Sequence, residues 1–122
     1  MTWVYKVSAH SFYLNGTYQF DAKYSGRPGY KNDSANECVK DNGPLPRGTY
    51  TIGTAFYHRR TRAWTMRLTP YVENKMCGRD GFMIHGDSAA HPGEASDGCI
   101  ILNLPYRKII DASSDKVLVV ED

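Results

Sequence analysis

Residues 82–102 read FMIHGDSAAHPGEASDGCIIL and decide the fold of the central part of this chain. Both ends of this stretch are short apolar runs, at residues 82–84 and 100–102, which are typical of buried strands. Between the runs, glycine, proline, serine and aspartate predict a loop that folds back. We therefore expect two neighbouring strands whose ends present His85 and Cys99 side by side.

His85 and Cys99 together indicate nucleophilic catalysis by a cysteine. The thiolate is the reactive form and a free thiol titrates near ~8.5, so a neighbouring imidazole is needed to provide thiolate at neutral pH. Gly98 permits a tight turn and a close approach to a substrate carbonyl, and we expect the backbone N–H groups of Gly98 and Cys99 to stabilise an oxyanion. His91 is nearer to Cys99 in sequence and is the alternative base, and a buried, inert thiol is the alternative for Cys99.

Two motifs of the chain resemble those of L,D-transpeptidases, cysteine enzymes that process the peptide stems of bacterial peptidoglycan. The first is Ile84-His85-Gly86 followed by Ser96-Asp97-Gly98-Cys99-Ile100, and the second is GPLPRGTYTI at residues 43–52. Tyr24-Ser25-Gly26 also stands where these enzymes usually carry a Ser/Thr-Gly pair. The resemblance spans roughly residues 20–104.

This resemblance implies a mainly β fold, an L,D-transpeptidase-like β-sandwich of mixed sheets with one short helix, as a single catalytic domain over residues 1–122. It implies that Cys99 is the nucleophile, that His85 is the base, and that the carbonyl of Gly86 orients the imidazole. Many members have a histidine where this chain has Asp97. We expect that departure to affect substrate preference more than catalysis.

A narrower resemblance, to the L,D-transpeptidase-like effectors of type VI secretion, comes from the compact length, the opening WVYKV and the variants at residues 29–33 and 85–88. It implies L,D-carboxypeptidase and D-amino-acid exchange activity on tetrapeptide stems through a Cys99 thioester. An antibacterial role, a cognate immunity protein and a secretion-system carrier are further implications. The alternatives are a housekeeping L,D-transpeptidase that forms 3-3 cross-links and a non-catalytic peptidoglycan-binding module.

Further polar residues near the motifs are candidates for substrate contact: Ser96, Asp97, Asp87 and Ser88. The last two are also turn-forming residues that can organise the loop after Gly86. Arg79 can bind a stem carboxylate through its guanidinium donors, with an ordinary surface ion pair as the alternative. The basic cluster HRRTR at residues 58–62 predicts a solvated hairpin loop, with contact to a stem carboxylate or glycan as the alternative.

Composition limits the classes of function. With 122 residues, of which 41% are hydrophobic, the chain suits one domain with its own core. The net charge of +2 does not indicate a nucleic-acid partner. The spacing of histidines and cysteines is not that of zinc sites, so we expect no metal and no cofactor. We also expect a monomer.

The chain has no apolar signal segment at its start and no run near the ~20 apolar residues of a membrane span. We expect it to be made in the cytoplasm without a signal peptide and secreted, to act in the periplasm of a target bacterium; a signal removed from the sequence is the alternative. In an oxidising periplasm Cys38 and Cys77 can pair and leave Cys99 free. Two reduced thiols are the alternative, because geometry decides whether a bridge forms.

Strand patterns recur along the chain. Residues 3–8 and 17–24 alternate around Asn15-Gly16, which predicts a hairpin. Residues 25–46 are rich in loop-forming residues and predict a long loop that borders or covers the active cleft. A second hairpin is predicted from residues 49–57 and 63–68, a helix from 105–112 with Pro105 in its first turn, and a last strand from 116–120.

Overall fold

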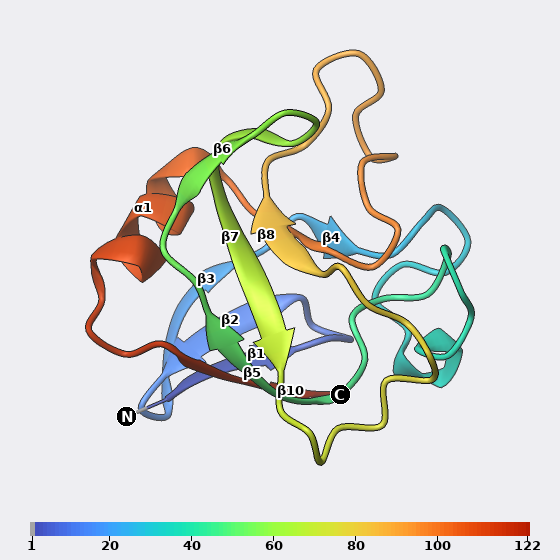
Figure 1. Ribbon diagram of the computed structural model, residues 1–122, viewed down its shortest axis with the longest axis horizontal. Coiled ribbons are helices and arrows are strands. Elements are labelled where there is room, and N and C mark those ends of the chain that lie inside the picture. The colour runs from blue at the N-terminus through green and yellow to red at the C-terminus, as the bar shows by residue number, and fades with distance from the viewer. Residues whose placement is uncertain (1) are drawn as a thin grey trace.

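The computed structural model describes residues 2–122 and consists mainly of β-strands (Figure 1). The strands are β1 (Trp3–Lys6), β2 (Ser11–Leu14), β3 (Thr17–Asp21), β4 (Tyr24–Ser25), β5 (Gly48–Ile52), β6 (Phe56–His58), β7 (Arg62–Pro70), β8 (Met83–His85), β9 (Ile100–Ile101) and β10 (Val117–Glu121). They pair in the order β3-β2-β1-β10-β5-β7-β8-β9-β4, and β6 pairs with β7 off this path. The β1–β10 and β8–β9 pairs are parallel and the others antiparallel, so the predicted mainly β fold with mixed pairing is confirmed.

The Asn15-Gly16 turn joins β2 to β3, whereas the sequence pattern paired residues 3–8 with 17–24. The turn itself is confirmed, since φ is 52° at Asn15 and 82° at Gly16, as a tight hairpin turn requires. The predicted partner strand is wrong, because the chain reverses earlier, where the His10 N–H donates to the Val7 carbonyl at 3.1 Å. β1 therefore pairs with β2 on one side and with β10 on the other.

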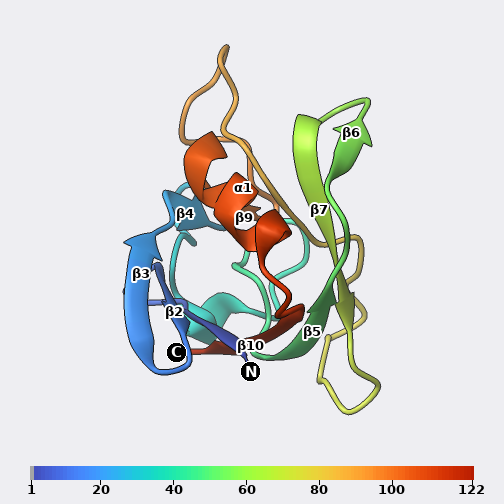
Figure 2. The ribbon, with the colours of Figure 1, turned by 90° about the vertical axis from the view of Figure 1, so that its left-hand side faces the viewer.

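Strand β7 connects the two halves of the fold. Its C-terminal part pairs with β5, its middle with β8 and its N-terminal part with β6, which confirms the predicted hairpin across the basic turn. In Figure 2, β2 and β3 lie on one side and β5 and β7 on the opposite side. The side chains enclosed between the halves have no exposed surface: Trp3, Tyr5, Phe12, Tyr50, Met66, Ile84, Ile100, Leu102, Ile110 and Leu118. Each of the isoleucine, leucine, methionine and phenylalanine side chains among them contributes about 1.5–3 kcal/mol by leaving water.

Helix α1 (Leu104–Ala112) covers part of this core and confirms the predicted helix, with a proline in its first turn. Ile110 is fully buried, and the ring of Tyr106 stacks on Phe20 with centroids 4.4 Å apart. Within residues 2–122 no helix combines the length and the apolar character that a bilayer crossing needs.

The long segment between β4 and β5 is a loop, as predicted, except for the short 3-10 helix η1 (Ser34–Asn36). A disulfide joins Cys38 in this loop to Cys77, in the connection between β7 and β8, with a Cα–Cα distance of 5.4 Å. The pairing of Cys38 with Cys77 is thus confirmed. Cys99 is the free cysteine of the described chain.

Candidate active site

His85 is the last residue of β8 and Cys99 directly precedes the neighbouring parallel strand β9, so that the two residues share one face of the sheet. β8 and β9 pair Ile84 with Ile100, so Cys99, one residue before β9, stands beside Met83. His85 follows Met83 by two residues and therefore points to the same face. The two Cα atoms are separated by one strand spacing of about 4.8 Å across and two residues, about 6.6 Å, along. The predicted juxtaposition of the two strand ends is confirmed.

The His85 imidazole is held in one tautomer. Its Nδ1 lies 2.8 Å from the carbonyl oxygen of Gly86, and since a carbonyl only accepts, Nδ1 carries the proton. Nε2 is therefore free to accept a proton. Burial lowers the pKa of His85, and although the hydrogen bond to Gly86 raises it, the charge of Arg107 adds to the lowering. The imidazole is neutral at neutral pH.

The Cys99 thiol is neutral as well. Burial of the thiol raises its pKa to about 11, although a hydrogen bond from the Met83 N–H and the charges of Arg60 and Arg79 act in the opposite direction. Because the thiol and the imidazole are both neutral, the site holds a proton acceptor beside a protonated thiol. Such a thiol can act as a nucleophile only if its proton leaves the sulfur during the attack.

Ser96 organises the turn that presents Cys99. Its side chain has no exposed surface, and its hydroxyl donates to the Cys99 carbonyl at 2.6 Å. The same oxygen accepts from the N–H groups of Gly26 at 2.9 Å and Gly98 at 3.0 Å. One donor and two acceptor positions are all that a hydroxyl has. The prediction that Ser96 contacts substrate is therefore corrected, because the residue is buried and fully engaged.

Gly98 occupies a position that only glycine fits. Its φ is +140°, and an added Cβ would lie 2.5 Å from the Phe82 ring and 2.7 Å from the Arg79 guanidinium. Its N–H donates to Ser96, which leaves the N–H of Cys99 as the remaining member of the predicted oxyanion pair. Its carbonyl accepts from Ser25 Oγ at 3.0 Å, which gives the Ser25-Gly26 pair a direct role in holding the turn.

Arg79 is 6% exposed, so the surface ion pair weighed from the sequence is wrong. Its guanidinium donates to four backbone carbonyls at 2.5–3.0 Å, those of Glu37, Gly43, Pro44 and Asp97. Four of its five N–H donors are engaged, so a stem carboxylate would have only the Nε–H to bind. These contacts indicate that Arg79 positions the backbone around Cys99.

The loop after His85 is organised by Asp87. The Asp87 carboxylate accepts from the Tyr24 hydroxyl at 2.6 Å and from the N–H groups of Ser88 and Gly93 at 2.9 and 3.2 Å. The Ser88 hydroxyl accepts from the N–H of His91 at 3.0 Å, so the predicted roles of Asp87 and Ser88 as loop organisers are confirmed. His91 is exposed on this loop and not on β8, which favours His85 as the base.

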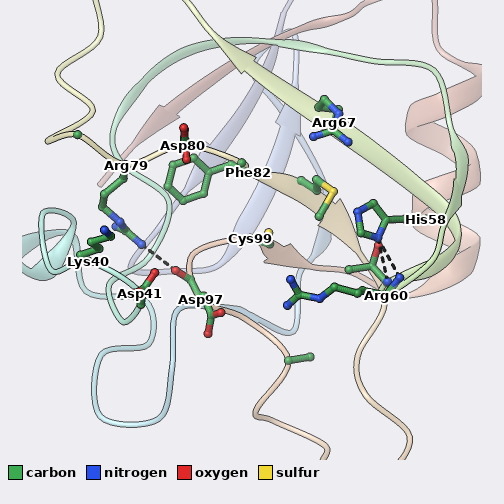
Figure 3. Close-up of a pocket in the computed structure, with 15 residues that line it drawn as sticks. Lys40, Asp41, His58, Arg60, Arg67, Arg79, Asp80, Phe82, Asp97 and Cys99 are labelled. Carbon is green, nitrogen blue, oxygen red and sulfur yellow. Dashed lines mark hydrogen bonds between the residues drawn. The ribbon is translucent and has the colours of Figure 1, made fainter.

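Cys99 opens onto a cavity of about 580 Å³ (Figure 3). Besides Cys99, its lining includes Lys40, Asp41, His58, Arg60, Thr61, Arg67, Arg79, Phe82, Met83 and Asp97. Lys40 and Asp41 confirm that the long loop borders the cleft. Asp97 is at the rim, where its carboxylate pairs with Arg27 at 2.7 Å.

Sequence reasoning missed that His58, Arg60 and Arg67 face this cavity. The basic cluster was expected to be a solvated loop, with contact to a stem carboxylate or glycan as the alternative. Its turn is indeed exposed, but His58, Arg60 and Thr61 also line the cleft. The available signal was the density of positive charge in one hairpin. In the described part of the chain, no three His, Cys, Asp or Glu side chains are grouped so that they could hold a metal ion.

Comparison with known proteins agrees with this geometry. Residues 19–120 match the Tlde1 domain, and no curated protein sequence matches the chain. An L,D-transpeptidase from Mycobacterium smegmatis has 18% identity and a TM-score of 0.55, over 99% of this chain and 58% of that chain. L,D-transpeptidase 1 of Mycobacterium tuberculosis has 17% identity and a TM-score of 0.56, over 99% of this chain and 61% of that chain. These similarities confirm the L,D-transpeptidase-like fold, and this chain spans about three-fifths of the length of those two chains.

Proposed function

Because this chain belongs to the Tlde1 domain family, we propose that it is a cysteine enzyme that acts on the tetrapeptide stems of peptidoglycan. Its activities are L,D-carboxypeptidase and L,D-transpeptidase reactions, the latter as exchange of D-amino acids, through a thioester on Cys99. The observation that supports this proposal best is the β8–β9 pairing, which brings Cys99 next to a histidine whose Nε2 is unprotonated. A thiol beside a free base, at the wall of a cavity, is the arrangement that acyl transfer requires.

The first half of the reaction forms the thioester. His85 Nε2 takes the proton of Cys99 while Sγ bonds to the carbonyl carbon between the diamino acid at position three and the terminal D-alanine. Negative charge develops on the carbonyl oxygen, where the Cys99 N–H stabilises it. The C–N bond then breaks, and the departing amine of D-alanine receives the proton from the imidazolium.

The second half resolves the thioester with an acceptor that His85 deprotonates. If water attacks, the products are a tripeptide and a restored Cys99 thiol, which is the carboxypeptidase reaction. If the amine of a free D-amino acid attacks, a new peptide bond forms and the terminal residue is exchanged. Both reactions remove or alter the tetrapeptide donors from which a cell forms 3-3 cross-links.

We further propose that the protein is an antibacterial effector that is secreted into the periplasm of a target bacterium. The family match supports this role, and the Cys38–Cys77 disulfide supports a site of action in an oxidising compartment. Such an effector needs a secretion-system carrier, and a cognate immunity protein that covers the cavity would protect the producing cell.

The test of the enzymatic proposal is mass spectrometry of purified disaccharide-tetrapeptide after incubation with wild type or Cys99→Ala, with and without an added D-amino acid. We expect loss of D-alanine, or its replacement, only when Cys99 is present. Formation of 3-3 cross-linked dimers would instead favour a housekeeping transpeptidase. Binding without any turnover would favour a peptidoglycan-binding module.

The test of the effector proposal is expression in a susceptible bacterium, with the chain directed either to the periplasm or to the cytoplasm. Growth arrest or lysis is expected only for the periplasmic wild type, and Cys99→Ala directed to the periplasm is the matched control. Normal growth with active enzyme present in the periplasm would contradict the antibacterial role without affecting the proposed chemistry.

A further inference from the structure

Two guanidinium groups face the Cys99 cavity without a carboxylate partner. Arg60 and Arg67 both line the cavity and are exposed. No carboxylate of residues 2–122 lies within ion-pair distance of either group, since the salt bridges of the described chain involve other residues. Arg67 lies over the Phe56 ring, 5.6 Å from its centroid, which restrains the side chain but leaves its charge uncompensated.

Strand register places Arg67 in one row with the nucleophile. Arg67 of β7 pairs with Met83 of β8, and Cys99 stands beside Met83 on the other side. Directly paired residues point to the same face of a sheet, so Arg67 and Cys99 flank Met83 about two strand spacings, roughly 9.6 Å, apart. An extended arginine side chain covers most of that distance.

Arg60 approaches the nucleophile from the turn between β6 and β7. Figure 3 draws Arg60, His58 and Arg67 on one side of Cys99 and Lys40 and Asp41 on the other. The charge of Arg60 acts on the thiol, where it opposes the rise of the Cys99 pKa. Because Arg60 and Cys99 line the same cavity, the Arg60 guanidinium faces the space in which a substrate bound to the sulfur would lie.

Two other charged residues of the cavity wall, Arg79 and Asp97, have partners, and Lys40, Asp41 and Asp80 lie on the opposite side of Cys99 from Arg60 and Arg67 (Figure 3). Four N–H groups of Arg79 donate hydrogen bonds to backbone carbonyls, and the Asp97 carboxylate forms an ion pair with Arg27. The guanidinium groups of Arg60 and Arg67 therefore remain without an ion-pair partner beside Cys99. A carboxylate is the group that a guanidinium binds best, through two parallel hydrogen bonds.

We propose that Arg60 and Arg67 form a subsite for the free C-terminal carboxylate of the amino acid that leaves. This inference rests on the proposed function and assigns its specificity: the enzyme acts only at the free end of a peptide stem. The carboxylate of a leaving amino acid is one residue away from the attacked carbon, a distance under about 4 Å. A side chain that binds this carboxylate must therefore lie close to the sulfur, as Arg60 and Arg67 do.

The subsite also selects the acceptor in the exchange reaction. A free D-amino acid that replaces D-alanine brings the same carboxylate to the same place, next to its attacking amine. An incoming amine without an adjacent carboxylate, such as a lysine side-chain amine, gains nothing from Arg60 and Arg67. We therefore expect exchange with free amino acids to be favoured over attack by amines that lack an adjacent carboxylate.

The experiment compares disaccharide-tetrapeptide as the free acid with the same compound carrying a C-terminal carboxamide. The proteins are wild type, Arg60→Gln, Arg67→Gln and Arg59→Gln, the last a matched control because Arg59 is an exposed neighbour on the same turn that does not line the cavity. Wild type and the control should prefer the free acid. The two test variants should lose about tenfold to hundredfold in kcat/KM on the free acid and little on the amide.

Equal kcat/KM of wild type on acid and amide, or an equal loss on both compounds in Arg60→Gln and Arg67→Gln, would overturn the subsite. If wild type turns over neither compound, the proposed function fails, and the subsite is then tested by binding alone. For that arm, titration calorimetry with Cys99→Ala measures the affinities of acid and amide. Tighter binding of the acid that disappears with Arg60→Gln supports the subsite, and equal affinities refute it.

Discussion

The Arg79 guanidinium donates a hydrogen bond to the backbone carbonyl of Asp97 at 2.7 Å, two residues before Cys99. The same side chain donates to the carbonyls of Gly43 and Pro44 in the upstream motif. Because the donors of a guanidinium are fixed in one plane, this side chain sets the spacing between the two motifs. The position of Cys99 therefore depends on a residue that belongs to neither motif.

Replacing Arg79 with lysine should lower both stability and turnover. Lysine keeps the charge but carries its three donors on one atom, so at least one of the four buried carbonyls loses its partner. We expect a loss of about 1–3 kcal/mol in the free energy of unfolding and a lower kcat. Urea denaturation and steady-state kinetics measure the two effects. Arg27→Lys, in an exposed pair with Asp97, is the control, and an Arg79→Lys protein with unchanged stability would refute the positioning role.

Gly98→Ala should abolish turnover, because the new methyl group meets Phe82 and Arg79 and the residue keeps a positive φ. The matched control is Gly29→Ala, where φ is +90° but no atom lies within 4 Å of the added Cβ. The control isolates the cost of the backbone conformation from that of the clash. Comparable activity in the two variants would show that the turn before Cys99 tolerates displacement.

Alkylation of Cys99 should continue to accelerate far above neutral pH. With the pKa of Cys99 raised to about 11, the thiolate fraction increases about tenfold per pH unit from pH 7 to pH 10. Rates of reaction with iodoacetamide, followed by intact-mass spectrometry, measure this profile. A rate that levels off near pH 7 would instead indicate a preformed thiolate–imidazolium pair.

Removing the disulfide should lower the free energy of unfolding by about 2–5 kcal/mol. The variant is Cys38→Ser combined with Cys77→Ser, which leaves Cys99 as the single thiol. Chemical denaturation with and without a reductant provides an internal control. The reductant should destabilise the wild type to the level of the double variant and leave the double variant unchanged; a wild type indifferent to reductant would contradict a stabilising bridge.

Asp87→Asn should destabilise the protein at neutral pH and progressively less below pH 4. Burial alone would raise the pKa of Asp87, but hydrogen bonds from Tyr24, Gly93 and Ser88 and the charge of Lys23 lower it below its ordinary value of 3.8. A carboxyl with a lowered pKa in the folded state stabilises that state above its unfolded pKa, and loses this effect as pH falls through the folded pKa. We expect about 1–3 kcal/mol at pH 7.

Thermal or urea unfolding of wild type and Asp87→Asn between pH 7 and pH 2.5 measures this prediction. Asp97→Asn is the control, because its exposed pair with Arg27 should add little to stability at any pH. A stability difference for Asp87→Asn that stays constant across this range would mean that the charge of Asp87 is not what organises the loop.

The neighbouring strands of the site were predictable because each is marked by a short apolar run next to a reactive residue. Ile84 and Ile100 are both buried in the core, so the residues next to them in sequence, His85 and Cys99, face the opposite side of the sheet. The pairing of Cys38 with Cys77 was one of two alternatives. The choice depended on a Cα separation that only the folded chain provides.

The roles of Ser96 and Arg79 were not predictable, because their partners are distant in sequence. Ser96 binds the N–H of Gly26, 70 positions away, and Arg79 binds the carbonyl of Glu37, 42 positions away. Polar residues near a motif are equally consistent with contact to substrate and with contact to backbone. The orientation of Arg60 was not predictable for a related reason: the register of β6 on β7 determines which side of the basic turn faces the cavity.

The parallel pairing of β1 with β10 affects the order in which the chain folds. β1 and β5 both lie next to β10, so the sheet is complete only after Val117–Glu121 has left the ribosome. Until then β1 and β5 each have an open edge, the kind of strand that readily pairs with another chain. Folding of this domain is therefore completed late in synthesis, and its long-range strand pairs make it slow. Protection by a chaperone is most valuable at that stage.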